Sequence, residues 1–187
     1  SKGAKIHQKF DCVINCTYSY TNNLQKILGI PELPIYKFEQ TEIVVVECGI
    51  DIPPLTIMDG PFITILPYVG HMNQYLIYDV VNSRIKSWND ISFEKKEIES
   101  NHELILDNCK TYFKFIDSVK YVKSLYANRP IHQGTFNDSR VTRISKYQGK
   151  IPIYSILEGK FATAPLISKQ MVKQIEEEML ITANENE

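Results

Sequence analysis

Apolar and polar residues alternate through the middle of this chain and recur at helical spacing near its end. From Ile35 onward, alternating or β-branched stretches separated by turn residues predict four or five antiparallel strands. These stretches are Tyr36–Gln40, Glu42–Cys48, Leu55–Met58, Phe62–Pro67 and Gln74–Val81. Apolar residues then return every three to four positions, which predicts a helix over Glu94–Phe115 that packs on this sheet.

The two ends of the chain have a different pattern. A buried strand over Phe10–Cys16 is followed by a helical turn that ends at Gly29, and a strand over Ile151–Leu157 is followed by an apolar-periodic helix over Leu166–Met179. Further β stretches are Val119–Tyr126 and Arg140–Ile144. We therefore expect an α+β fold, in which an antiparallel sheet with a packed helix is flanked by edge pieces of a nucleotide-binding α/β layer.

The turn between the last strand and the last helix is the first candidate site. In Gly159–Pro165, a glycine allows close approach of the backbone, and the helix start offers N–H groups and the positive end of the helix dipole. Lys160 adds a full positive charge. These residues predict an anion site, although an ordinary strand-to-helix connection uses the same residue types.

Composition narrows the classes of protein. The 187 residues suffice for one domain or two small interleaved ones, and a net charge of −1 argues against a broad nucleic-acid-binding surface. No apolar run approaches the length of a membrane span, so we expect a soluble, cytoplasmic protein without nucleic-acid or membrane partners. The four cysteines lack zinc-site spacing, and Cys12 and Cys16 are predicted to be buried on one face of a strand. No metal site is expected.

The order of short motifs resembles the carboxy-terminal half of flavin-dependent oxidoreductases of the D-amino-acid oxidase and glycine oxidase type. Val13–Tyr18 looks like the strand that lies against the flavin domain in that family, and Asn128-Arg129-Pro130 looks like the strand that re-enters beside the flavin. The segment Ser155–Ala164 is similar to the closing glycine turn and helix, and Asp59–Phe62 to a turn of the substrate domain.

The resemblance implies FAD as the cofactor and a small anionic amino or hydroxy acid as the substrate. It implies a remnant of the FAD-binding layer at 1–29, a β-rich substrate-binding domain at 30–128, and a return to the FAD-binding layer at 129–187. Arg129 matches the family position that holds a substrate carboxylate. The residues expected at the flavin are Asn15, Thr17, Gly159, Lys160, Phe161, Ala162 and Thr163.

Tyr75 and Tyr78 on the predicted substrate sheet are further candidates for substrate contacts, although tyrosines in sheets more often serve in packing. Arg84 is a weaker candidate for the same role as Arg129. His71, in a glycine-containing turn, has the residue type of a general base, but a single loop histidine is usually only solvated. We assign no catalytic residue.

The chain contains no GxGxxG motif, the turn that holds a dinucleotide pyrophosphate. We therefore expect a fragment of a longer protein, or a subunit whose partner carries the nucleotide-binding segment. By itself the chain is expected to be inactive and to bind FAD weakly. The alternative is a non-enzymatic ligand-binding or subunit-interaction domain with no redox role.

Overall fold

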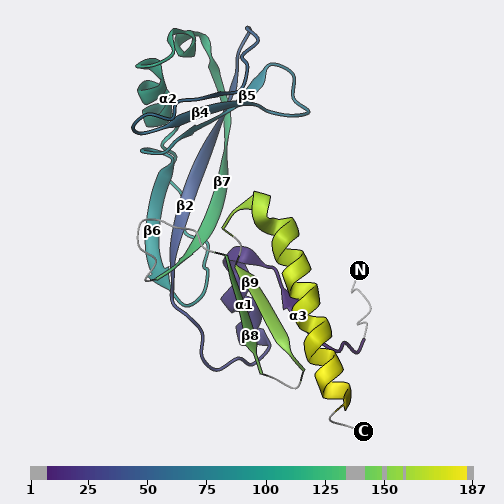
Figure 1. Cartoon of the computed structure of the whole chain (residues 1–187). Coiled ribbons are helices and arrows are strands. Elements are labelled where there is room, and N and C mark those ends of the chain that lie inside the picture. The colour runs from purple at the N-terminus through teal and green to yellow at the C-terminus, as the bar shows by residue number, and fades with distance from the viewer. Residues whose placement is uncertain (1–7, 134–141, 149–150, 158, 185–187) are drawn as a thin grey trace, which may run out of the picture. The chain divides into compact units, whose positions relative to one another are not determined.

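The computed structural model describes residues 8–133, 142–148, 151–157 and 159–184 of the chain (Figure 1). It divides into two compact units. Unit 1 comprises Ser1–Ile35, Ile91–Phe93 and Ile131–Glu187, and unit 2 comprises Tyr36–Asp90 and Glu94–Pro130. The boundaries expected from the sequence were 29/30 and 128/129, whereas the units change at 35/36 and 130/131 and also exchange the short segment Ile91–Phe93.

Unit 1 is built on a three-stranded sheet that joins the two ends of the chain. Its order is β1 (Val13–Asn15), β9 (Ile153–Leu157) and β8 (Arg143–Tyr147), with β9 in the centre. β1 runs parallel to β9, and β8 runs antiparallel to it. The expected strands Phe10–Cys16 and Ile151–Leu157 are thus confirmed in shorter form, and the parallel pair brings their ends together as an α/β layer requires.

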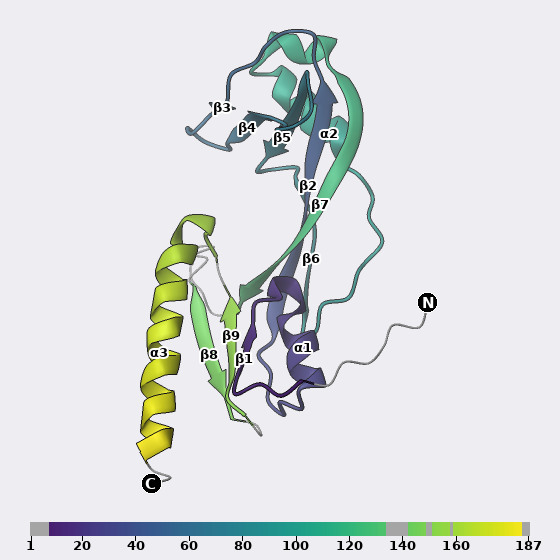
Figure 2. The same cartoon turned by 90° about the vertical axis from the view of Figure 1, so that its right-hand side faces the viewer.

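A helix follows each of the two parallel strands of this sheet along the chain. The 3₁₀ turn η1 (Tyr18–Tyr20) and α1 (Thr21–Ile27) follow β1, and α1 is closed by Gly29, whose φ of 78° is a left-handed conformation that suits glycine. After β9 come the 3₁₀ turn η4 (Phe161–Thr163) and the long helix α3 (Ala164–Asn184), which runs alongside β8 and β9 in both views (Figures 1 and 2).

Unit 2 is organised around one long central strand. The predicted strands Tyr36–Gln40 and Glu42–Cys48 form a single strand, β2 (Tyr36–Glu47). Val44–Glu47 pairs antiparallel with β5 (Gln74–Asp79), and Tyr36–Thr41 pairs antiparallel with β6 (Arg84–Asp90). β7 (Lys120–His132) also pairs with β2. The sheet continues from β5 through β4 (Ile63–Pro67) to the two-residue strand β3 (Leu55–Thr56).

The core of unit 2 lies between this sheet and α2 (His102–Lys110). Ile105 and Cys109 of the helix are fully buried against side chains of β2, β4 and β5. The short 3₁₀ helix η2 (Lys114–Ser118) follows and contributes Ile116. The prediction of an antiparallel sheet backed by a helix is therefore confirmed, and the chain as a whole combines a few helices with mainly antiparallel sheets.

The helix is shorter than the predicted Glu94–Phe115 at both ends, since residues 94–101 are not helical and α2 ends at Lys110, before η2 begins at Lys114. The buried carboxylate of Glu42 accepts hydrogen bonds from the backbone N–H of Asn101 at 2.7 Å and from the Ser100 hydroxyl at 2.6 Å. These bonds satisfy groups just before the first turn, so the helix begins at His102 rather than at Glu94.

Two further expectations are corrected. The strand predicted over Gln74–Val81 ends at Asp79, because the Asp79 carboxylate accepts the Val81 N–H at 2.9 Å and forms a turn. Cys16 lies beyond the end of β1 and is exposed, and Cys12 is only partly buried. The predicted strand Arg140–Ile144 corresponds to β8, and residues 140 and 141 lie outside the described residues.

A polar cluster ties α3 to the sheet of unit 1. Glu178 on α3 forms an ion pair with Lys146 and accepts hydrogen bonds from the hydroxyl of Tyr154 and, at 3.0 Å, from Gln174. The pairing with Lys146, followed by the bonds from Tyr154 and Gln174, lowers the pKa of Glu178 from 4.5 to about 2. Burial and the bond to Glu178 raise the pKa of Tyr154 to about 12.

We predict that Glu178→Gln lowers the free energy of unfolding at pH 7 by about 1 kcal/mol, because it removes a charged acceptor that is still partly exposed. The depressed pKa of Glu178 means that its contribution is complete above pH 4.5 and is lost as pH falls toward 2. Urea unfolding of both proteins at several pH values should show a difference that shrinks over this range. Glu177→Gln, on the same helix and 62% exposed, is the matched control, and a difference independent of pH would contradict the assignment.

Candidate functional site

A buried carboxylate surrounded by three cations lies on the central strand of unit 2. Glu39 on β2 is fully buried. Its Oε2 forms an ion pair with Nη2 of Arg129 at 2.6 Å and accepts a hydrogen bond from Nε of the same guanidinium at 2.8 Å. Its Oε1 accepts a hydrogen bond from Nη1 of Arg84 at 3.3 Å and forms an ion pair with Nζ of Lys37 at 3.0 Å. We call these four residues the Glu39 cluster.

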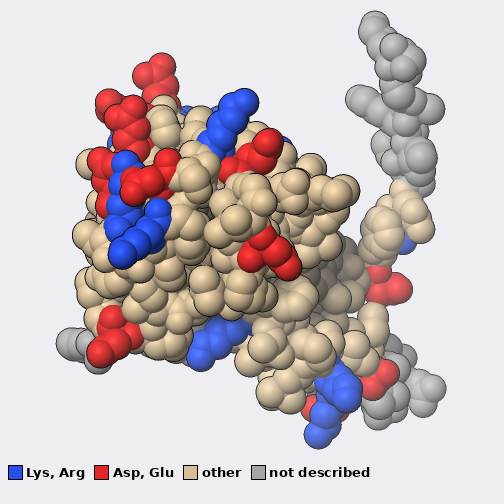
Figure 3. All heavy atoms as spheres, turned by 90° about the horizontal axis from the view of Figure 1, so that it is seen from above, with Lys and Arg blue, Asp and Glu red and all other residues tan. Residues whose placement is uncertain are grey.

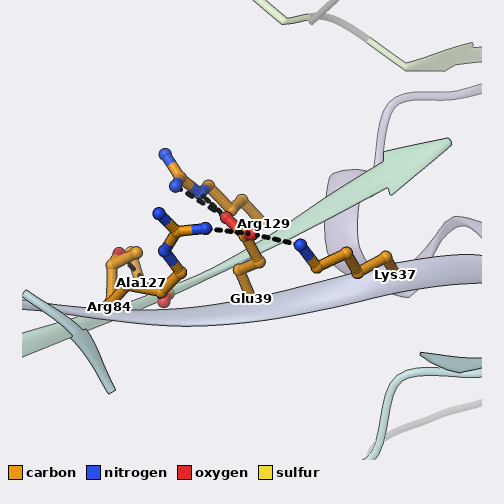
Figure 4. Close-up of polar contacts among 6 residues, drawn as sticks. Lys37, Glu39, Arg84, Ala127 and Arg129 are labelled. Carbon is orange, nitrogen blue, oxygen red and sulfur yellow. Dashed lines mark hydrogen bonds and ion pairs between the residues drawn. The ribbon is translucent and has the colours of Figure 1, made fainter. Parts of the chain in front are cut away.

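Three adjacent strands bring the cluster together. Lys37 and Glu39 are two positions apart on β2, so their side chains leave the same face of the strand. Arg84 begins β6 beside Thr41, where a register shift between Gln40 and Thr41 interrupts the pairing, and Arg129 comes from β7 (Figure 4). β7 is held to β2 next to the cluster, because the Thr41 hydroxyl donates to the carbonyl of Ala127 at 3.3 Å.

The cluster carries an excess of positive charge. Burial alone would raise the pKa of Glu39, but the hydrogen bonds and charges of Lys37 and Arg129 outweigh burial and lower it. Glu39 is thus ionised at neutral pH, and three cations against one carboxylate leave two positive charges. The side chain of Arg129 is 22% exposed, and those of Arg84 and Lys37 are each 38% exposed, so the cations face solvent while Glu39 does not.

The structure brings together the two arginines that the sequence suggested as anion-binding residues, Arg129 and Arg84. Lys37 and Glu39 were not recognised from the sequence. The available signal was the Lys37-Phe38-Glu39 alternation inside an otherwise β-type stretch, because a charge in the interior of a central strand requires a partner. The partners come from distant parts of the chain, so the sequence alone did not identify them.

The two tyrosines proposed as substrate contacts lie on opposite faces of β5. Tyr75 is 5% exposed, and its hydroxyl donates to the carbonyl of Ile50 and accepts the N–H of Ile52, both at 3.0 Å. Its side chain therefore serves the core of unit 2, which is the packing alternative weighed from the sequence. Tyr78 is half-buried, and its ring lies against Phe62 with centroids 6.2 Å apart.

Two of the residues expected at the flavin, Asn15 and Thr17, shape the loop that follows β1. The Asn15 amide donates to the carbonyl of Thr21 at 2.9 Å and to its hydroxyl at 3.2 Å, while its oxygen accepts the N–H of Thr17 at 3.1 Å and the hydroxyl at 2.6 Å. The Thr21 hydroxyl reaches Ser155 on β9 at 2.7 Å. Both the amide nitrogen and the amide oxygen of Asn15 are therefore engaged in hydrogen bonds within unit 1, and these bonds hold the loop after β1.

The remaining candidates at the flavin form the turn before α3. Gly159 precedes Lys160, whose backbone is extended, and η4 then leads into α3. The Lys160 carbonyl accepts the N–H of Thr163 at 3.1 Å and its hydroxyl at 2.8 Å. Phe161 is 96% exposed, and Ala162 is also exposed. The turn thus presents the start of a long helix at the surface of unit 1.

His71 stacks on Tyr68 in the β4–β5 turn, with ring centroids 4.1 Å apart. Within the described residues no group of histidine, cysteine and acidic side chains is arranged to hold a metal ion. None of the described helices has the length and apolar character needed to cross a membrane. Seen from above, acidic and basic side chains are mixed, and a wide area carries neither (Figure 3).

The fold is similar to that of two solved oxidases. Glycine oxidase from Geobacillus kaustophilus matches 79% of this chain with a TM-score of 0.54 and 15% sequence identity. Iminodiacetate oxidase from Chelativorans sp. BNC1 matches 81% with a TM-score of 0.53 and 11% identity. The chain spans 35% and 38% of the length of these two proteins. No protein-family model matches the sequence, and no curated protein matches it.

We predict that Glu39→Gln lowers the free energy of unfolding by about 2–4 kcal/mol, because it removes the negative charge that three neighbouring cations share and replaces one acceptor oxygen by an amide donor. Arg84→Gln should cost less, since Lys37 still occupies the same oxygen. Glu47→Gln, at the exposed end of β2, is the matched control and should change stability by less than about 0.5 kcal/mol. Urea unfolding measures all three, and equal effects of Glu39→Gln and Glu47→Gln would refute the structural role of the cluster.

Proposed function

We propose that this chain supplies the substrate-binding sheet and the closing turn and helix of a flavin-dependent oxidoreductase. The substrate is a small anionic amino or hydroxy acid. The fold shared with two oxidases and the order of the short motifs support this proposal. Because the chain spans just over a third of those proteins, we further propose that a nucleotide-binding part, on the same polypeptide or on a partner subunit, completes the enzyme.

The observation that carries the proposal is the convergence of Arg129 and Arg84 on one cationic site. A substrate carboxylate needs fixed, charge-assisted donors, and guanidinium groups provide them in a planar arrangement. Glu39 fixes both groups, so the donors are oriented before a substrate arrives. In this proposal Arg129 and Arg84 bind and orient the substrate anion.

The described residues fit a flavin at the turn before α3 rather than at the side chains of the first loop. N–H groups in the first turn of a helix have no intrahelical acceptors, so Phe161 and Ala162 offer backbone donors beside the Lys160 side chain. The amide of Asn15 is already fully engaged. We therefore propose that Gly159–Thr163 holds the electron-rich edge of the flavin, while Asn15 and Thr17 only shape the neighbouring loop.

Bound flavin supplies the acceptor for the hydride that leaves the substrate carbon. This chain's own contribution is electrostatic and geometric. The helix start and the Lys160 ammonium favour negative charge at the turn, and the two guanidinium groups neutralise the substrate anion. We assign no residue of this chain as the general base.

The alternative function is a ligand-binding or subunit-interaction domain without redox chemistry. The absence of GxGxxG from the sequence favours it, and the Glu39 cluster would bind an anion equally well in that role. The absorption spectrum of the complete gene product, purified without added cofactor, separates the two. Bands of oxidised flavin support the oxidoreductase, and a protein with no flavin bands that also fails to bind added FAD supports the alternative.

We predict that the 187-residue chain by itself binds FAD weakly or not at all, because it lacks the turn that holds the pyrophosphate. Titration of the chain against a fixed FAD concentration, followed by flavin fluorescence, tests this expectation. Stoichiometric binding at micromolar concentration would overturn it and would place the determinants of FAD affinity within these residues.

In the complete enzyme, Arg129→Leu should raise KM for an acidic substrate by a factor on the order of ten to a thousand, since a lost charge-assisted pair costs about 1.5–4 kcal/mol. Lys86→Leu, an exposed residue of β6, is the matched control. Arg129→Lys should restore part of the affinity, because it keeps the charge but loses the planar donors. Steady-state kinetics on folded variants measures these effects, and an unchanged KM in Arg129→Leu would leave Arg129 with a purely structural role.

A further inference from the structure

We infer that the Glu39 cluster selects ligands that carry two negative charges over ligands that carry one. This inference rests on the proposed function, since it assigns the substrate class of the same site. A simple amino or hydroxy acid presents one carboxylate, which one positive charge neutralises. The cluster has two positive charges in excess, which is more than one carboxylate can neutralise.

The charge balance of the cluster favours a ligand with two negative charges. Lys37, Arg84 and Arg129 share Glu39, and no second carboxylate among the described residues forms an ion pair with any of them. Two positive charges therefore remain in one small region. A ligand with one negative charge would leave one of them uncompensated, and a ligand with two would neutralise the site.

The two arginines also keep hydrogen-bond donors that Glu39 does not use. Arg129 uses Nε and Nη2 on Glu39, which leaves Nη1 directed away from that carboxylate. Arg84 uses only Nη1, which leaves Nη2 and Nε. Figure 4 shows the two guanidinium groups on the same side of Glu39, with Lys37 reaching its carboxylate from the other side. The two arginines thus present separate donors side by side, which suits two anionic oxygen groups.

Glu39 itself holds the two guanidinium groups together. Without a shared acceptor, the two guanidinium groups, on two strands that both pair with β2, would repel one another and turn toward solvent. Glu39 is fully buried and holds them in place from below the surface, while the arginine side chains stay 22% and 38% exposed. The donors are therefore preorganised, and a ligand does not have to order them.

The test is calorimetric titration of the 187-residue chain at constant ionic strength. Malonate and inorganic phosphate each carry about two charges near pH 8, and acetate is the probe with one. We expect the dissociation constant of at least one dianion to be at least tenfold lower than that of acetate. Tighter binding of malonate would identify a dicarboxylate ligand, and tighter binding of phosphate would identify a phosphorylated one.

Variants link this preference to the residues. Arg84→Gln should bring the affinities for dianion and acetate within about threefold of each other, because it removes one of the two guanidinium groups, and Arg84→Lys should restore much of the difference. Lys86→Gln, exposed on the same strand, should leave it unchanged. Thermal unfolding checks that each variant is folded.

Equal affinity of the unaltered chain for acetate and both dianions would overturn the inference, and so would a preference that survives in folded Arg84→Gln. These outcomes are distinct from failure of the proposed function. A flavin-containing gene product without dianion preference contradicts only the inference, and dianion preference in a gene product that binds no flavin contradicts only the oxidoreductase.

Discussion

The buried carboxylate of Glu39 is the constraint on which the arrangement of unit 2 depends. A carboxylate that is fully removed from water must be compensated by partners, and here they come from its own strand, from β6 and from β7. The ion pairs therefore fix the lateral position of three strands as well as their order. A slip of one residue along β2 would turn Glu39 to the opposite face, where Phe38 stacks on Trp88 with ring centroids 5.7 Å apart. One charge thus specifies the register of the sheet.

A second carboxylate acts in the same way on the other face of β2. Glu42 lies three positions after Glu39, so the two side chains leave opposite faces of the strand. Glu42 is also fully buried, and it is satisfied by Ser100, by the N–H of Asn101 and by Ser124 on β7. Its acceptor oxygens determine where α2 begins. The central strand of unit 2 therefore positions the cation cluster on one face and the packed helix on the other.

The sequence was sufficient where the local pattern and the tertiary structure agree. β2, β4, β5, β9 and α3 were predicted because strands buried on one or both faces are rich in β-branched residues and a surface helix keeps its apolar period. β6 was missed, because most of its side chains are exposed and its sequence has no β-branched run.

The Glu39 cluster could be found only in part from the sequence. Its members at 37–39, 84 and 129 are adjacent solely through strand pairing. Asn15 was predicted from the sequence as a residue at the flavin, whereas the hydrogen bonds that occupy its amide run to Thr17 and Thr21, which no local pattern indicates.

In the proposed binding role, the combination of one carboxylate with three cations would also limit which ligands the Glu39 cluster binds. Three cations alone would attract any polyanion, while a neutral pair of one arginine and one glutamate would attract none. The shared acceptor reduces the excess to two charges and orients the groups that carry it, so in the proposed binding role selectivity would come from the donors that the internal ion pairs leave over. The excess is maintained at neutral pH because Arg129 and Lys37 lower the pKa of Glu39, which keeps the shared carboxylate ionised. The residue that stabilises the sheet is therefore also the residue that sets the charge of the site.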